Sequence, residues 1–78
     1  MLVEALATPD ETVGSYYVKK LAAGGLPAFL TSPSAEDAAR VYKVHIGRYG
    51  NQNDAEKVAR RIEAYESLRC RVLQENRE

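Results

Sequence analysis

Few residues of this 78-residue chain could perform catalysis, and their spacing does not favour it. His45 is the single histidine and Cys70 the single cysteine, so no pair of such residues lies at metal-ligand spacing. The sequence shows no nucleophile–base pair, no carboxylates that suggest a buried dyad, and no phosphate-binding loop. We therefore predict that the protein is not an enzyme and that it holds no metal and no cofactor.

The polar side chains that could bind a ligand lie at alternate positions of predicted strands. Tyr42, Val44 and Ile46 recur with a period of two, which predicts a strand with one buried face. Lys43 and His45 then point to the opposite face. Strands are also predicted over residues 2–7, 26–31 and 68–73. Their outward positions are Glu4, Leu6, Pro27, Phe29, Thr31, Arg69 and Arg71.

Two amphipathic helices must support these strands. The second is predicted from Asn53, where the apolar spacing changes to three and four residues. Its buried stripe is formed by Ala55, Val58, Ala59 and Ile62. The first is predicted to have Thr8 as its N-cap and Pro9 as its first residue, and to end at Gly24-Gly25. Its buried stripe is formed by Gly14, Tyr17, Val18 and Leu21.

The order βαββαβ predicts a single α+β domain over residues 1–78, a two-layer sandwich of the ferredoxin-like kind. Two helices would cover one face of a four-stranded antiparallel sheet, with the first and third strands at its centre. The chain also repeats: an offset of 41 residues places Val3 on Val44 and Leu21 on Ile62. We interpret residues 2–31 and 41–74 as two related halves, joined by a polar connection over residues 32–39.

Composition excludes several classes of function. Lys plus Arg and Asp plus Glu number 11 each, so the net charge of zero gives no general attraction to nucleic acid or anionic lipid. The outward positions of the two central strands carry no aromatic residue for stacking bases, which also argues against RNA binding. No apolar run is long enough for a membrane helix, and no signal peptide is visible. We predict no nucleic-acid partner and no direct membrane contact by this stretch of chain.

The second half of the chain resembles the SPOR (sporulation-related repeat) domain family. The family's repeat reads roughly Tyr-Arg-Val-x-Val-Gly-Pro-Phe, followed by a polar turn and a helix rich in Ala and Glu. Tyr42, Val44, Gly47 and the AEKVARRI segment at 55–62 match this pattern, and Lys43 stands for its arginine. The GGLPAFL segment at 24–30 is similar to the family's turn into its second strand. The resemblance extends over residues 2–74.

This resemblance implies a peptidoglycan-binding module that favours glycan strands stripped of their stem peptides. It also implies a place in the bacterial periplasm or cell envelope, at the division septum, as a fragment of a longer targeted protein. Carried over by position, the glycan-binding face would be Glu4 on the first strand and Lys43 and His45 on the third. Phe29 and Arg71 are flanking candidates, and Leu6 is included as the next outward position of the first strand. A polymer rich in hydroxyl and acetamido groups needs fixed donors and acceptors and a ring on which to stack.

The sequence also departs from the family. Glu4 stands where the family usually has glutamine, Leu6 where it has glycine, and Arg48 where it has proline. An ionised glutamate only accepts hydrogen bonds, whereas glutamine also donates them. A repurposed domain is therefore the alternative, in which Leu6 and Phe29 form an apolar patch for protein interaction or dimerisation through the open sheet face.

Several of these residues also have ordinary structural interpretations. His45 could be a solvated residue in the middle of an exposed strand. Lys43 could pair with Glu4 across the sheet, which would contribute about 0.2–1 kcal/mol. Phe29 would belong to the core if the parity of its strand were reversed. Cys70 is expected to be a buried and inert thiol.

Overall fold

The structure, a computed structural model, describes residues 1–34 and 40–74. The elements in chain order are β1 (Leu2–Thr8), α1 (Glu11–Ala23), β2 (Ala28–Thr31), β3 (Tyr42–Gly47), α2 (Gln52–Glu66) and β4 (Arg71–Leu73). The strands form one sheet in the order β2-β3-β1-β4, and every neighbouring pair is antiparallel. The predicted α+β two-layer sandwich, with the first and third strands at the centre, is confirmed.

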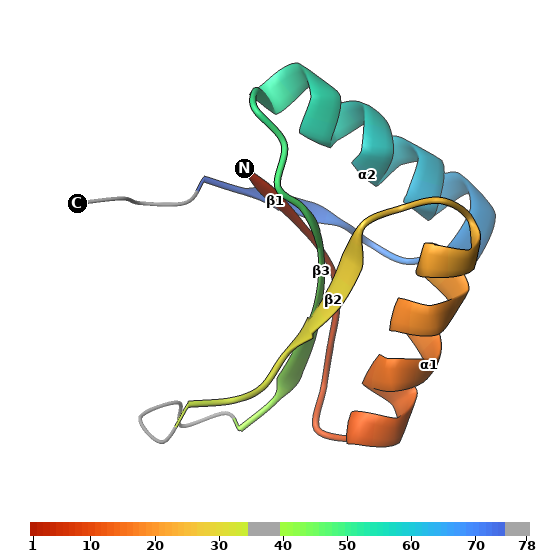
Figure 1. Ribbon diagram of the computed structural model, residues 1–78, viewed down its shortest axis with the longest axis vertical. Helices are drawn as coiled ribbons and strands as arrows, with labels where there is room; N and C mark the ends of the chain where they lie inside the picture. Colours follow the sequence, from red (N-terminus) through yellow and green to blue (C-terminus); the bar gives the residue numbers. More distant parts are fainter. Residues whose placement is uncertain (35–39, 75–78) are drawn as a thin grey trace.

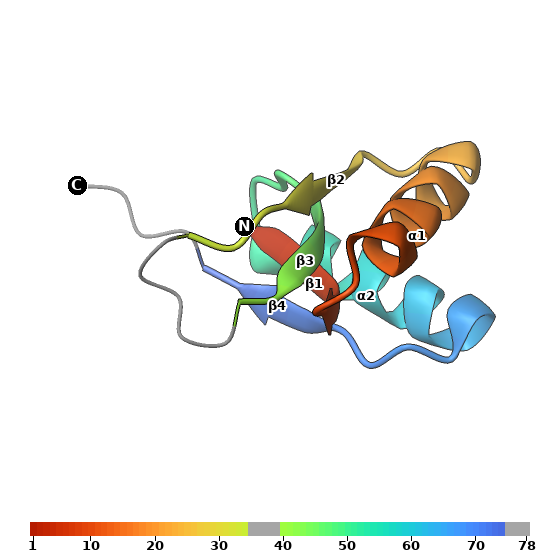
Figure 2. The ribbon, with the colours of Figure 1, turned by 90° about the horizontal axis from the view of Figure 1, so that it is seen from below.

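Both helices pack on the same face of the sheet and leave the other face without a covering layer (Figures 1 and 2). The core lies between the two layers. Its buried apolar side chains are Val3, Ala5, Leu21, Val44, Ile46, Ala55, Ala59 and Ile62. The predicted inward positions of the central strands are therefore correct. The pairs Val3/Val44 and Leu21/Ile62, related by the offset of 41 residues, are all buried.

Helix α1 begins later than predicted. Thr8 still belongs to β1, where it pairs with Tyr42, and its hydroxyl accepts a hydrogen bond from the Asp10 amide at 3.1 Å. Asp10 is the N-cap, and its carboxylate accepts from the Thr12 amide at 2.9 Å. The prediction of Thr8 as N-cap and Pro9 as first helical residue was wrong, because the strand ladder holds Thr8.

The end of α1 follows the predicted glycine pair. Gly25 has a φ of +90°, and its amide donates to Ala22 O at 3.0 Å. The Leu26 amide donates to Leu21 O at 3.2 Å, which completes a Schellman motif. Because this motif holds Leu26, β2 begins at Ala28, two residues after the predicted start.

Helix α2 begins with the Asn51 side chain, which accepts from the Asp54 amide at 2.9 Å. The predicted apolar stripe of this helix faces the sheet. The two buried alanines, Ala55 and Ala59, present little bulk and allow close packing on the strands. The helix ends where Ser67 adopts a left-handed conformation with a φ of 57°.

The sheet differs from the prediction at two places, and both differences affect its uncovered face. The register of β1 against β3 shifts between Glu4 and Leu6, which is a β-bulge. Leu6 consequently pairs with the buried Val44 and packs against the core, so the prediction that it points outward was wrong. Glu4, before the bulge, still pairs with His45.

Strand β4 is the second departure, because it has three residues and not the predicted six. The Cys70 amide donates to the Glu63 carboxylate at 3.0 Å and not to the sheet. Leu68 and Cys70 pack against the core as predicted, and β4 pairs with β1 only from Leu2 to Glu4. Of the predicted connection over residues 32–39, residues 35–39 lie outside the described part of the chain.

The packing of α2 on the sheet predicts a large difference between two positions of the same helix. Ile62 is 2 % exposed and Tyr65 is 80 % exposed. We expect Ile62→Ala to lower the free energy of unfolding by about 2–5 kcal/mol and Ile62→Val by about 0.5–1.5 kcal/mol. The control Tyr65→Ala should stay within about 0.5 kcal/mol of the parent. Urea unfolding measures all three, and equal effects of Ile62→Ala and Tyr65→Ala would contradict this packing.

Candidate functional site

The uncovered face of the sheet is built from rows of side chains that run across the strands. The middle row crosses all four strands, since the register places Phe29 beside His45, His45 beside Glu4, and Glu4 beside Arg71. One neighbouring row contains Thr31, Lys43 and Ala7, and the other contains Gly47, Leu2 and Leu73. The face therefore has a polar middle row, with a partly polar row on one side of it and a row of glycine and leucines on the other.

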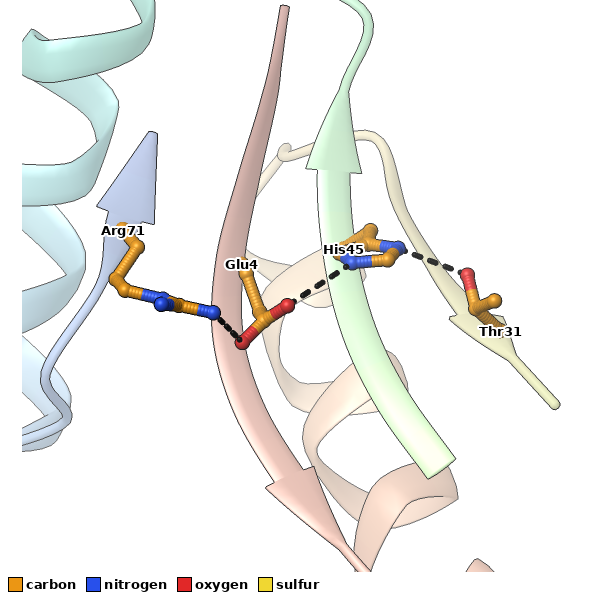
Figure 3. A network of polar contacts seen from close by, with 4 residues as sticks. All are labelled: Glu4, Thr31, His45 and Arg71. Atoms are coloured by element: carbon orange, nitrogen blue, oxygen red, sulfur yellow. Dashed lines mark hydrogen bonds and ion pairs between the residues drawn. The ribbon is translucent and has the colours of Figure 1, made fainter. Parts of the chain in front are cut away.

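The two central residues of the middle row are buried, although no helix covers them. Glu4 is 9 % exposed and His45 is 7 % exposed. Their side chains point toward one another, with His45 Nε2 3.5 Å from Glu4 Oε1 (Figure 3). Figure 1 shows the strands bowed toward α1, so the uncovered face is the concave side of the sheet, and we call it the hollow face. The two buried residues lie between Phe29 and Arg71 in the same row.

The outer residues of this network complete a chain of contacts from one edge strand to the other (Figure 3). Thr31 Oγ1 lies 2.8 Å from His45 Nδ1, and Arg71 Nη2 lies 3.3 Å from Glu4 Oε2. A proton on His45 Nε2 faces the Glu4 carboxylate. The Thr31 hydroxyl can donate to Nδ1 or accept from it.

The central contact is too long to be a hydrogen bond. Within the described residues, Glu4 Oε1 and His45 Nε2 are buried atoms without a hydrogen-bond partner. Burying polar groups in this way is costly unless charge complementarity offsets the loss of water. The register of the two central strands places the two groups side by side at 3.5 Å, and they form the floor of the site.

This geometry changes the roles of two predicted glycan contacts. Glu4 and His45 were expected to be exposed, but both are part of the floor. What they offer to a ligand is indirect, because Glu4 holds the Arg71 guanidinium and His45 holds the Thr31 hydroxyl. The Arg71 side chain itself is 71 % exposed. The prediction of a solvated His45 was wrong.

Of the other predicted glycan contacts, two lie on the uncovered face and one does not. Phe29 lies on the uncovered face, with its ring centroid 5.8 Å from that of His45 in an edge-on arrangement. Lys43 is on the same face but pairs with Thr31 and Ala7, so the predicted cross-strand pair with Glu4 was wrong. Leu6 is absent from the face, because the bulge turns it to the core.

The sequence interpretation missed three residues of this face as parts of the site. Thr31 was recognised as outward but not as a partner of His45. Leu2 and Leu73 pair with each other across β1 and β4, at the end of the face nearest Gly47. The period-two pattern of the sequence already placed both leucines on the face opposite the core, so they could have been included in the predicted site.

An open cleft of about 780 Å³ lies next to the uncovered face, where β4 stops pairing with β1. Its walls are the second half of β1, the segment from Ser67 to Cys70, and Glu63 of α2. Arg69 and Arg71 line it as well. A smaller pocket of about 190 Å³ lies on the helical side, where Lys20 and Glu66 form an ion pair at 3.0 Å.

Cys70 lines the cleft as a half-buried free thiol. Burial raises the pKa of this thiol to about 11, and the nearby Glu63 carboxylate adds to the effect. A thiol that stays protonated at neutral pH is a poor nucleophile. Cys70 therefore acts here as a packing residue.

The chain forms a small α+β domain, and the uncovered face of its sheet carries a network of four polar side chains. Among residues 1–34 and 40–74, no group of three or more His, Cys, Asp or Glu side chains could hold a metal ion. No helix in the described part of the chain is long and apolar enough to cross a membrane. Comparisons with protein-family models, with curated proteins and with solved structures found no match.

The contact between Thr31 and His45 predicts a measurable contribution to stability. Thr31→Val keeps the shape of the side chain but leaves the buried Nδ1 atom without a partner. We expect the free energy of unfolding to fall by about 1–2 kcal/mol. Thr12→Val is the matched control, because Thr12 is exposed on α1, and it should change stability by less than about 0.5 kcal/mol. Equal effects in urea unfolding would show that the hydroxyl does not support His45.

The raised pKa of Cys70 predicts slow alkylation of the folded protein. The rate with iodoacetamide should keep rising until the pH reaches about 11, because only the thiolate reacts. In urea, the same profile should move to the lower pKa of an exposed thiol. The neutral thiol favours the folded state, so its contribution to stability is present at lower pH and is lost as the pH rises toward about 11. A folded-state profile that matches the unfolded one would contradict the burial of this side chain.

Proposed function

We propose that this domain binds glycan strands of peptidoglycan in the hollow, uncovered face of its sheet. One observation carries the proposal: a row of Phe29, His45, Glu4 and Arg71 crosses all four strands of that face. The row places the Phe29 ring at one end and the Arg71 cation at the other, with His45 and Glu4 as a buried polar floor between them. The proposal places the chain in the bacterial periplasm or cell envelope, as part of a longer targeted protein.

The chemistry of the face suits a sugar polymer. Arg71 donates hydrogen bonds, Thr31 can donate or accept them, and Lys43 donates from the neighbouring row. Phe29 offers apolar ring surface against which a pyranose ring can pack. Because Glu4 and His45 fix Arg71 and Thr31 from below, these groups lose less conformational freedom when a ligand binds.

The shape of the face supports the same interpretation. The strands curve so that this face is the concave side of the sheet (Figure 1). A concave face that runs along extended strands suits an extended polymer. Leu6, one half of the apolar patch suggested for dimerisation, is turned toward the core. The dimerisation alternative is therefore less well supported.

Two departures from the SPOR pattern are compatible with glycan binding in this geometry. Glu4 replaces a glutamine, but both of its partners in the row, Arg71 and the Nε2–H of His45, are donors that an acceptor suits. Leu6 replaces a glycine, but the bulge removes its bulk from the face. The resemblance and the geometry thus favour the same surface.

The experiment is sedimentation with purified peptidoglycan sacculi, before and after an amidase removes the stem peptides. We expect the fraction of domain in the pellet to rise after stripping. The variant Phe29→Ala should weaken binding to stripped sacculi by roughly tenfold, through loss of about 1–2 kcal/mol of stacking and burial.

Tyr65→Ala removes an exposed ring from the helical side and serves as the control, with binding unchanged. A folded parent domain that pellets with neither form of sacculus would contradict the proposed function. If Phe29→Ala bound normally and Tyr65→Ala did not bind, the binding surface would lie on the helical side and not on the uncovered face.

A further inference from the structure

The cleft beside β1 is continuous with the uncovered face of the sheet. Three of its lining residues, Glu4, Ala7 and Arg71, also belong to the rows of that face. The cleft exists because β4 pairs with β1 only as far as Glu4. A polymer lying in the hollow face would therefore have room for a side branch at this edge of the sheet.

The charges in the cleft are not equally available to a ligand. Its two carboxylates are both engaged: Glu63 accepts the Cys70 amide at 3.0 Å, and Glu4 is shared between Arg71 and His45. Its two guanidinium groups are freer. Arg69 forms no ion pair with any residue that the structure describes, and the Arg71 side chain is 71 % exposed although one of its nitrogens faces Glu4.

A guanidinium has five N–H donors in a planar fork that matches a carboxylate. Arg71 uses one nitrogen on Glu4 and can present the others to the cleft. Glu4 thus orients a cation that still has donors to offer, at the boundary between the hollow face and the cleft. The site fits an anionic group of carboxylate size carried on a branch of the bound polymer.

We propose that Arg71 recognises the free lactyl carboxylate of a stripped glycan strand, with Arg69 as a second cation in the cleft. This inference rests on the proposed function. When an amidase hydrolyses the bond between the lactyl group and the stem peptide, water is consumed and the lactyl carbonyl becomes a carboxylate. In an intact strand, the same carbonyl belongs to an uncharged amide. A cation at this point therefore distinguishes the two forms by charge.

The experiment separates charge from bulk. Soluble stripped glycan strands are compared with the same strands after their carboxylates are coupled to methylamine, which removes the charge and adds little volume. Binding of the parent domain, Arg71→Gln and the control Arg60→Gln is measured by titration calorimetry. Arg60 is exposed on α2, where its nearest partner is Glu56 at 3.9 Å.

We expect the parent domain to prefer the carboxylate form by at least tenfold. Arg71→Gln should lose most of this preference, because only Arg69 remains in the cleft, and Arg60→Gln should keep it in full. A parent domain that binds both forms equally, or an Arg71→Gln variant that keeps the preference, would overturn the inference but leave glycan binding intact. Binding to neither form would overturn the proposed function as well.

Discussion

The buried contact between Glu4 and His45 is the constraint on which the uncovered face depends. It joins the two central strands at a point where no helix excludes water, yet both side chains are about nine-tenths buried. A carboxylate and an imidazole in such a place are costly to leave without partners. Arg71 and Thr31 supply partners from the two edge strands, so one polar network extends across the whole sheet. In the function that we propose, a ligand would contact the outer part of this network.

The β-bulge is the second feature that shapes this face. It inserts one residue between Glu4 and Leu6, so the polar side chain stays outward while the apolar one turns to the core. Without it, Leu6 would stand on the ligand side of β1. The short β4 acts in a similar way, because its early end opens the cleft beside the second half of β1. Both irregularities lie next to the row that we assign to binding.

The regular parts of the fold could be predicted because their patterns are local. The alternation in β3 and the helical spacing in α2 each follow from a few neighbouring residues, and Gly24-Gly25 carries its own helix-ending signal. The bulge could not be predicted, because Glu4 and Leu6 have the same parity in sequence and only pairing with β3 separates them. The burial of His45 could not be predicted either, since it depends on partners from the two neighbouring strands. Of the six candidate glycan contacts, Phe29, Lys43 and Arg71 are placed on the surface of the face, Glu4 and His45 in its floor, and Leu6 outside it.

The most direct test of this account is an NMR titration of the isotope-labelled domain with soluble stripped glycan strands. If the hollow face binds the glycan, the amide signals of Phe29, Lys43, His45 and Arg71 should shift together as the glycan is added. Signals from the outer surfaces of α1 and α2, such as that of Tyr65, should stay in place. Shifts confined to the helices, or a spectrum of the folded domain that the glycan does not change, would contradict the account.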